Sequence, residues 1–116
     1  MKASATAARE RYTMTWIFAV NCSAFGNSDL VGVVCGETPV ALYRMEDGYF
    51  ATSDRCPHQG AALSQGCVVK NYIECPLHFA LFDIRTGQAD GGVTTKAVRA
   101  FATRVEGDEI YVDLPT

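Results

Sequence analysis

Short runs of apolar residues, alternating with polar ones and separated by turn residues, follow one another from position 15 to about 52 and again from about 98 to 114. Such runs, rich in Val, Ile, Phe and Tyr, are typical of β-strands. No stretch after position 13 has a sustained period of 3.6 residues, so we expect little helix. The pattern predicts an all-β domain, with strands at residues 16–20, 30–35, 40–45, 49–52, 98–105 and 109–114.

Turn residues lie where these strands end. Glu46-Asp47-Gly48 and Glu106-Gly107-Asp108 each separate two strand-like runs, which predicts two hairpins. Between residues 53 and 92 the alternation is lost, and we expect loops there. Because loops on a rigid sheet often carry functional residues, this interval is the first place to look for chemistry.

Length and charge exclude several classes of protein. A chain of 116 residues suits one domain, for which we expect residues 14–116, preceded by a flexible extension at residues 1–13. Ten basic against thirteen acidic residues give a net charge of −3, which argues against a nucleic-acid partner. The apolar runs are too short to span a bilayer and no signal peptide is evident, so we expect a cytoplasmic protein without a membrane partner.

The cysteines and histidines are arranged in pairs. Five cysteines are an odd number, so they cannot all form intramolecular disulfides. The two histidines each follow a cysteine closely, in Cys56-Pro57-His58 and in Cys75-Pro76-Leu77-His78, and sixteen residues separate His58 from Cys75. This pairing predicts that Cys56, His58, Cys75 and His78 bind a metal.

Two thiolates and two imidazoles suit either a single zinc ion or an iron–sulfur cluster with mixed ligands. Zinc modules usually pair like ligands across short gaps, whereas each loop here supplies one cysteine and one histidine. That arrangement favours two irons, one bound by both cysteines and the other by both histidines. A structural zinc-binding module remains the alternative.

The two motifs and their flanks resemble the Rieske [2Fe–2S] family. The resemblance is carried by residues 56–61, by residues 75–83 and by Thr86-Gly87. It implies the Rieske fold, an antiparallel β-sandwich or barrel base with a small cluster-binding subdomain formed by loops at about residues 53–92. It also implies one [2Fe–2S] cluster per chain, held by Cys56, His58, Cys75 and His78.

Four positions indicate the class within this family. Ala61 and Leu77 stand where respiratory and photosynthetic members have the cysteines of a disulfide. Ala80 and Phe82 stand where high-potential members have a serine and a tyrosine whose hydroxyls bond the cluster sulfurs. Without those hydrogen bonds we expect a low reduction potential, about −150 to 0 mV.

The chain has no further histidine for a mononuclear catalytic iron, so we expect an electron carrier and not an enzyme. It resembles the Rieske ferredoxin of a bacterial aromatic-ring-hydroxylating dioxygenase system. The resemblance implies two partners: an NADH-dependent flavoprotein ferredoxin reductase as electron donor and a terminal oxygenase as acceptor. The small subunit of assimilatory nitrite reductase is a similar domain and is the alternative within this fold.

Other residues carry weaker predictions. We expect three cysteines to be small buried side chains, and three acidic residues to form a solvated face. Phe79, next to His78, packs in the core or contacts a partner together with Gln59. The three cysteines are Cys22, Cys35 and Cys67, and the acidic residues are Glu46, Asp47 and Asp54.

Overall fold

The computed structural model describes residues 14–57, 60–77, 79–90 and 94–114. Within these ranges the chain forms ten strands, all paired antiparallel, and two 3-10 helices of at most four residues, too short to cross a bilayer. The predicted all-β class is confirmed. The elements are β1(Trp16–Asn21), η1(Cys22–Phe25), β2(Leu30–Cys35), β3(Thr38–Met45), β4(Gly48–Ser53), η2(Leu63–Gln65), β5(Cys67–Val69), β6(Tyr72–Glu74), β7(Leu81–Asp83), β8(Ala100–Phe101), β9(Thr103–Glu106) and β10(Glu109–Asp113).

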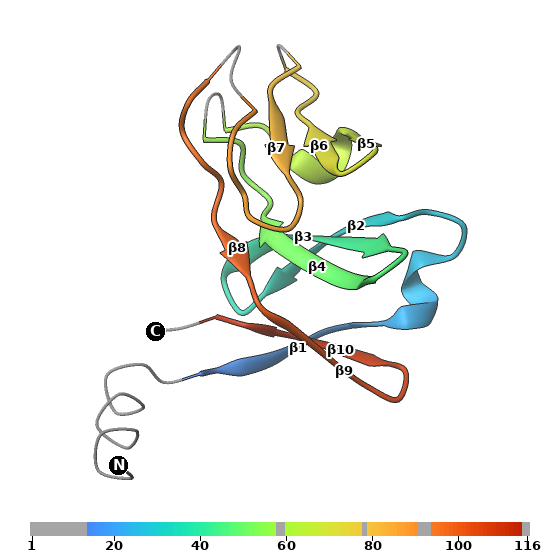
Figure 1. The fold of residues 1–116 in the computed structure, drawn as a ribbon. Helices are drawn as coiled ribbons and strands as arrows, with labels where there is room; N and C mark the ends of the chain where they lie inside the picture. The colour runs from blue at the N-terminus through green and yellow to red at the C-terminus, as the bar shows by residue number, and fades with distance from the viewer. Residues whose placement is uncertain (1–13, 58–59, 78, 91–93, 115–116) are drawn as a thin grey trace, which may run out of the picture.

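The strands form three sheets (Figure 1). One has the order β1-β10-β9 and a second the order β2-β3-β4-β8, and these two make the base of the molecule. The third, β5-β6-β7, lies above the base in Figure 1 and forms a small upper subdomain. This arrangement agrees with the expected sandwich-like base and separate loop subdomain.

Two tight hairpins in the base lie where the turn residues predict them. β3 pairs with β4 as far as Met45 opposite Gly48, and β10 pairs with β9 as far as Glu109 opposite Glu106. Gly107, in the second turn, has a φ of 61°, a left-handed conformation that glycine adopts without a Cβ clash.

The predicted single strand at residues 98–105 is wrong, because the structure has two strands there. β8 pairs with β4 in one sheet, whereas β9 pairs with β10 in the other. Ala102 lies between them, and its carbonyl accepts a hydrogen bond from the Asp113 N–H at 3.0 Å. The β-prone run continues across this crossing because local residue types favour a strand but do not record which strand is the partner.

The interval from 53 to 92, expected to be loops, also contains regular structure. It holds η2 and the three strands β5, β6 and β7, each only three residues long. A run of three residues is too short to show a period of two clearly, so the sequence pattern does not reveal them.

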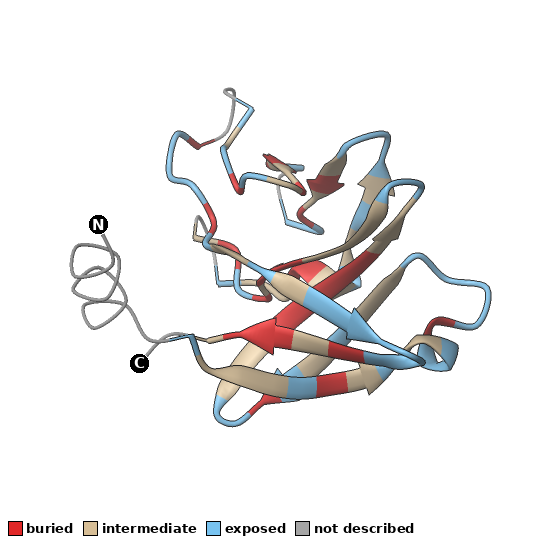
Figure 2. Cartoon of the chain, turned by 60° about the horizontal axis from the view of Figure 1, so that its bottom comes forward, coloured by how far each residue is buried: buried red, intermediate tan, exposed pale blue. Residues whose placement is uncertain are grey.

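Two apolar clusters hold the layers together. Buried residues, red in Figure 2, occur both in the base and in the upper subdomain. One cluster lies between the two base sheets and includes Val40, Leu42, Ile110 and Val112. The other joins the base to the upper subdomain. Its buried members are Ala41, Tyr43, Cys56, Leu63, Ile73, Cys75, Ala80, Phe82, Ile84 and Val98. The second cluster therefore contains both cysteines of the predicted metal site.

The remaining cysteines differ in burial. Cys35 is buried as predicted, and Cys22 is half-buried against the base cluster. The prediction for Cys67 is wrong, because it is exposed on β5. Val68 packs on the upper cluster, so the alternation of the strand turns Cys67 and Val69 toward solvent.

Candidate metal centre

Cys56 and Cys75 come from different layers of the fold and meet in the same core. Cys56 follows the end of β4 by three residues, and Cys75 directly follows β6. They are 1% and 0% exposed, and neither forms a disulfide. Free thiols buried this deeply are either small core side chains or metal ligands.

The two cysteine-bearing loops share a backbone form. The N–H of Cys56 donates to the carbonyl of Ala61, and the N–H of Cys75 donates to that of Ala80, both at 2.7 Å and both five residues along the chain. The fourth residue after each cysteine has a positive φ, 77° at Gly60 and 58° at Phe79. In the residues that the structure describes, the two loops therefore share the same backbone hydrogen bond and the same positive φ.

Burial and a neighbouring thiol disfavour an isolated thiolate at Cys75. Burial raises the pKa of the Cys75 thiol, the N–H of Leu77 lowers it by donating to Sγ at 3.4 Å, and the neighbouring Cys56 raises it again. Two thiolates in an apolar core repel each other and lose hydration, which a soft metal ion offsets. The donor set therefore fits a thiolate-bound iron or zinc.

The predicted histidine ligands, His58 and His78, and the predicted docking residue Gln59 lie outside the described residues, as do residues 1–13. Among the described residues, no three His, Cys, Asp or Glu side chains gather as metal ligands do. The structure thus describes the cysteine half of the predicted site.

Phe79 and Leu77 lie on the surface, on either side of position 78 in the chain. Their side chains are 69% and 45% exposed, so core packing is wrong for Phe79. Its φ of 58° is uncommon for a residue with a bulky side chain. Because Phe79 is exposed, packing in the core does not explain why an aromatic residue adopts this unfavourable backbone conformation.

Ala80 and Phe82 are 1% and 0% exposed in the cluster that contains both cysteines. Both side chains are apolar, so neither can donate a hydrogen bond to a sulfur. Tyr43, in the same cluster, has a buried hydroxyl, but its Oη is bonded to Thr52 Oγ1 at 2.8 Å.

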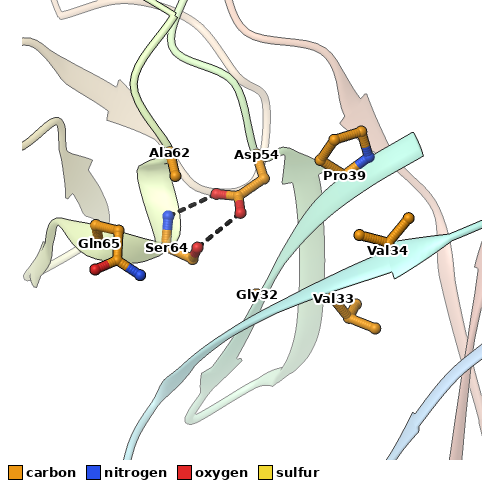
Figure 3. Close-up of a pocket in the computed structure, with 8 residues that line it drawn as sticks. All are labelled: Gly32, Val33, Val34, Pro39, Asp54, Ala62, Ser64 and Gln65. Carbon is orange, nitrogen blue, oxygen red and sulfur yellow. Dashed lines mark hydrogen bonds between the residues drawn. The ribbon is translucent and has the colours of Figure 1, made fainter. Parts of the chain in front are cut away.

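One residue beside the site differs from its sequence-based prediction. Asp54 is expected on a solvated face, but this is wrong: it is 9% exposed and bonds Ser64 (Figure 3). The two residues border an open pocket of about 440 Å³. They are ten positions apart, and no local pattern connects an aspartate to a serine at that separation.

Comparison with known proteins places the chain in one family. The family model of the Rieske [2Fe-2S] domain matches residues 15–102. The ferredoxin component of the naphthalene 1,2-dioxygenase system of Pseudomonas aeruginosa is 34% identical over 102 residues, which are 88% of this chain and 98% of that protein.

Two solved structures are also similar. The ferredoxin of carbazole 1,9a-dioxygenase from Nocardioides aromaticivorans has a TM-score of 0.78 and 30% identity, with 84% of this chain and 96% of that chain covered. A ferredoxin in complex with the reduced oxygenase of carbazole 1,9a-dioxygenase has a TM-score of 0.76 and 32% identity, with 84% and 92% covered.

Proposed function

The chain belongs to the Rieske [2Fe-2S] domain family, and we propose that it is the ferredoxin component of a bacterial aromatic-ring-hydroxylating dioxygenase system. In this role it is a cytoplasmic one-electron carrier and not an enzyme. It receives electrons from an NADH-dependent flavoprotein reductase and passes them to a terminal oxygenase. The oxygenase partner is supported by the carbazole dioxygenase complex, in which a similar ferredoxin is bound to its oxygenase.

One observation carries the proposal: Cys56 and Cys75 lie buried as free thiols in matching loops, and each is followed in sequence by a histidine. We assign Cys56, His58, Cys75 and His78 as the ligands of one [2Fe–2S] cluster per chain. Such a cluster, when bound, supplies reversible one-electron reduction.

The described residues suit this role in three ways. The apolar side chains around both cysteines exclude water from their sulfurs. The N–H of Leu77 stabilises negative charge on Cys75 Sγ. Ala80 and Phe82 have apolar side chains that cannot donate hydrogen bonds to the cluster sulfurs. Their absence as donors supports a reduction potential at the low end of the Rieske range, about −150 to 0 mV.

The direct test is metal analysis of the purified protein. We expect two irons and two acid-labile sulfides per chain, and a Rieske electron paramagnetic resonance spectrum after reduction. A colourless protein with one zinc and no sulfide would overturn the assignment. Turnover of an aromatic substrate by a purified reductase and oxygenase should then depend on added ferredoxin.

The ligand assignment is tested by single substitutions. Cys56→Ser, Cys75→Ser, His58→Ala and His78→Ala should each lose the cluster or its characteristic spectrum. Cys67→Ser is the matched control, because Cys67 is exposed and should leave iron and sulfide contents unchanged. Retention of both the cluster and its spectrum in a ligand variant would remove that residue from the set.

We propose that Phe79 and Gln59 contact the electron-transfer partners. The exposure of Phe79 beside a proposed ligand supports this role, since aromatic side chains that become buried on binding dominate many interfaces. Phe79→Asp should slow reduction by the reductase without changing the optical spectrum. Val105→Asp, at an exposed position on β9, is the control. Equal rates in both variants and the wild type would exclude Phe79 from the contact.

A further inference from the structure

Asp54 lies at the base of the first cysteine loop, two residues before Cys56. Its backbone is bonded on both sides: its N–H donates to the carbonyl of Pro39 in β3, and its carbonyl accepts from the N–H of Leu63 in η2, both at 3.0 Å. The residue therefore ties the loop to the base and has little freedom to move.

The carboxylate of Asp54 accepts on both oxygens. Oδ1 accepts from the Ser64 N–H and Oδ2 from Ser64 Oγ, each at 2.6 Å (Figure 3). Both donors are neutral. Of the ion pairs formed by described residues, none involves Asp54; they join arginines to Asp29, Asp47 and Glu106. Asp54 is thus a largely buried carboxylate that forms no ion pair within 4 Å with a described cation.

Ser64 is held against the base by close packing at Gly32. A Cβ at position 32 would approach Ser64 Cβ to 2.8 Å and Asp54 Oδ2 to 3.1 Å, so β2 can come this near only with glycine. The arrangement of Asp54 and Ser64 is therefore rigid, and the charge stays at one place relative to the loop.

The charge of Asp54 acts on Tyr43, a member of the apolar cluster that contains both cysteines. Burial raises the pKa of Tyr43, the hydrogen bond with Thr52 lowers it, and the charge of Asp54 raises it. Tyr43 is fully buried in the same apolar cluster as Cys56 and Cys75. Charges interact more strongly in such surroundings than in water.

We propose that the fixed negative charge of Asp54 lowers the reduction potential of the [2Fe–2S] cluster. Reduction adds one electron, and a nearby carboxylate raises the energy of the more negative state. The inference rests on the proposed function and its cluster ligands. It identifies a residue outside the ligand set that affects the reduction potential, and so the driving force for electron transfer. Asp54 acts together with the absence of hydroxyl donors at Ala80 and Phe82.

Asp54→Asn tests the charge with little change in shape. The new Oδ1 can accept from the Ser64 N–H, and the new Nδ2 can donate to Ser64 Oγ after the hydroxyl rotates. We expect an optical redox titration of the cluster-loaded protein to give a more positive midpoint potential than the wild type. An unchanged or lower midpoint would overturn the proposal.

Two controls separate charge from structure. Ser64→Ala keeps the carboxylate and removes one donor, so its midpoint should be unchanged or lower. Glu109→Gln removes the same charge in β10, at the far side of the base, and its shift should be much smaller (Figure 1). An upward shift in Ser64→Ala equal to that in Asp54→Asn would assign the effect to the hydrogen bonds and overturn the proposal.

If Asp54→Asn fails to retain its cluster, Asp54→Ser removes the same charge and leaves a polar hydroxyl at the same position. Its midpoint should again be more positive than that of the wild type, and an equal or lower midpoint would overturn the proposal. A wild type without a [2Fe–2S] spectrum would instead refute the proposed function, so the two failures are distinguishable.

Discussion

At the scale of single residues, the two cysteine loops differ most clearly at their fourth position. Gly60 and Phe79 both have positive φ, yet only glycine adopts that conformation without a Cβ clash. The cost for another residue is about 1 kcal/mol or more. Phe79 is mostly exposed, so little burial offsets this cost. The strain supports a role for its side chain in contacts with another molecule.

Substitutions at these two positions should have opposite effects on stability. Phe79→Gly should raise the free energy of unfolding by about 1 kcal/mol, because the strain is relieved. Gly60→Ala should lower it by about 1 kcal/mol, since a Cβ there meets nothing within 4 Å and only the φ is unfavourable. Urea unfolding of cluster-loaded proteins measures both. A loss of stability in Phe79→Gly would show that its conformation carries no net strain.

At the scale of elements, close backbone approaches hold the short upper strands and their loops in place. Gly87, after β7, has a φ of 80°, and a Cβ there would clash with the carbonyl of Val98. The same two residues are joined by a hydrogen bond from the Val98 N–H to the Gly87 carbonyl at 2.8 Å. The approach connects the upper sheet to the chain that returns to β8.

Gly87→Ala should therefore be much more destabilising than Gly107→Ala. Both glycines have positive φ, but a Cβ at Gly107 meets nothing within 4 Å. We expect a loss of about 2 to 4 kcal/mol for Gly87→Ala, from strain and clash together, and of about 1 kcal/mol for Gly107→Ala. Thermal unfolding followed by circular dichroism compares them. Equal losses would mean that the loop at Gly87 moves aside freely.

At the scale of the whole molecule, Arg85 connects the upper subdomain to the base. Its guanidinium donates to both oxygens of Asp47, at 2.6 and 3.1 Å, and to Asn71 at 3.1 Å, and it lies 4.8 Å from the ring centre of Phe50. Asp47 lies in the β3–β4 turn, whereas Arg85 follows β7. Docking of the two parts is thus supported by one multiply bonded side chain besides the shared core.

This contact predicts a pH dependence. The hydrogen bond from Arg85 lowers the pKa of Asp47 below its ordinary value. The ionised Asp47 carboxylate therefore stabilises the fold at pH values above the ordinary pKa, and this stabilisation is lost as the pH falls through the lowered pKa. In urea unfolding below about pH 4, the wild type should lose more of its stability than Asp47→Asn. Arg85→Met should also lose less stability than the wild type at low pH. If both variants lose as much stability as the wild type, the Asp47–Arg85 contact is not the source of the pH dependence.

Much of the fold and site follows from local pattern. The predicted bounds of β2 are those observed, and both base hairpins lie at their predicted turns. The alternating apolar face and the turn residues act over a few positions, so the sequence displays them directly. The paired Cys/His motifs are equally local, and they are sufficient to indicate the Rieske family. The three-residue strands β5, β6 and β7 carry too little pattern to be predicted.

Local sequence was thus enough to predict the all-β class and the family, and to propose which residues hold a cluster. Which face each side chain occupies depended on the folded chain. Folding buries Asp54 on Ser64, exposes Cys67 and Phe79, and divides one apparent strand between two sheets. The physical reason is that burial and strand partners depend on contacts between segments far apart in the chain, whereas ligand type and strand pattern depend on near neighbours.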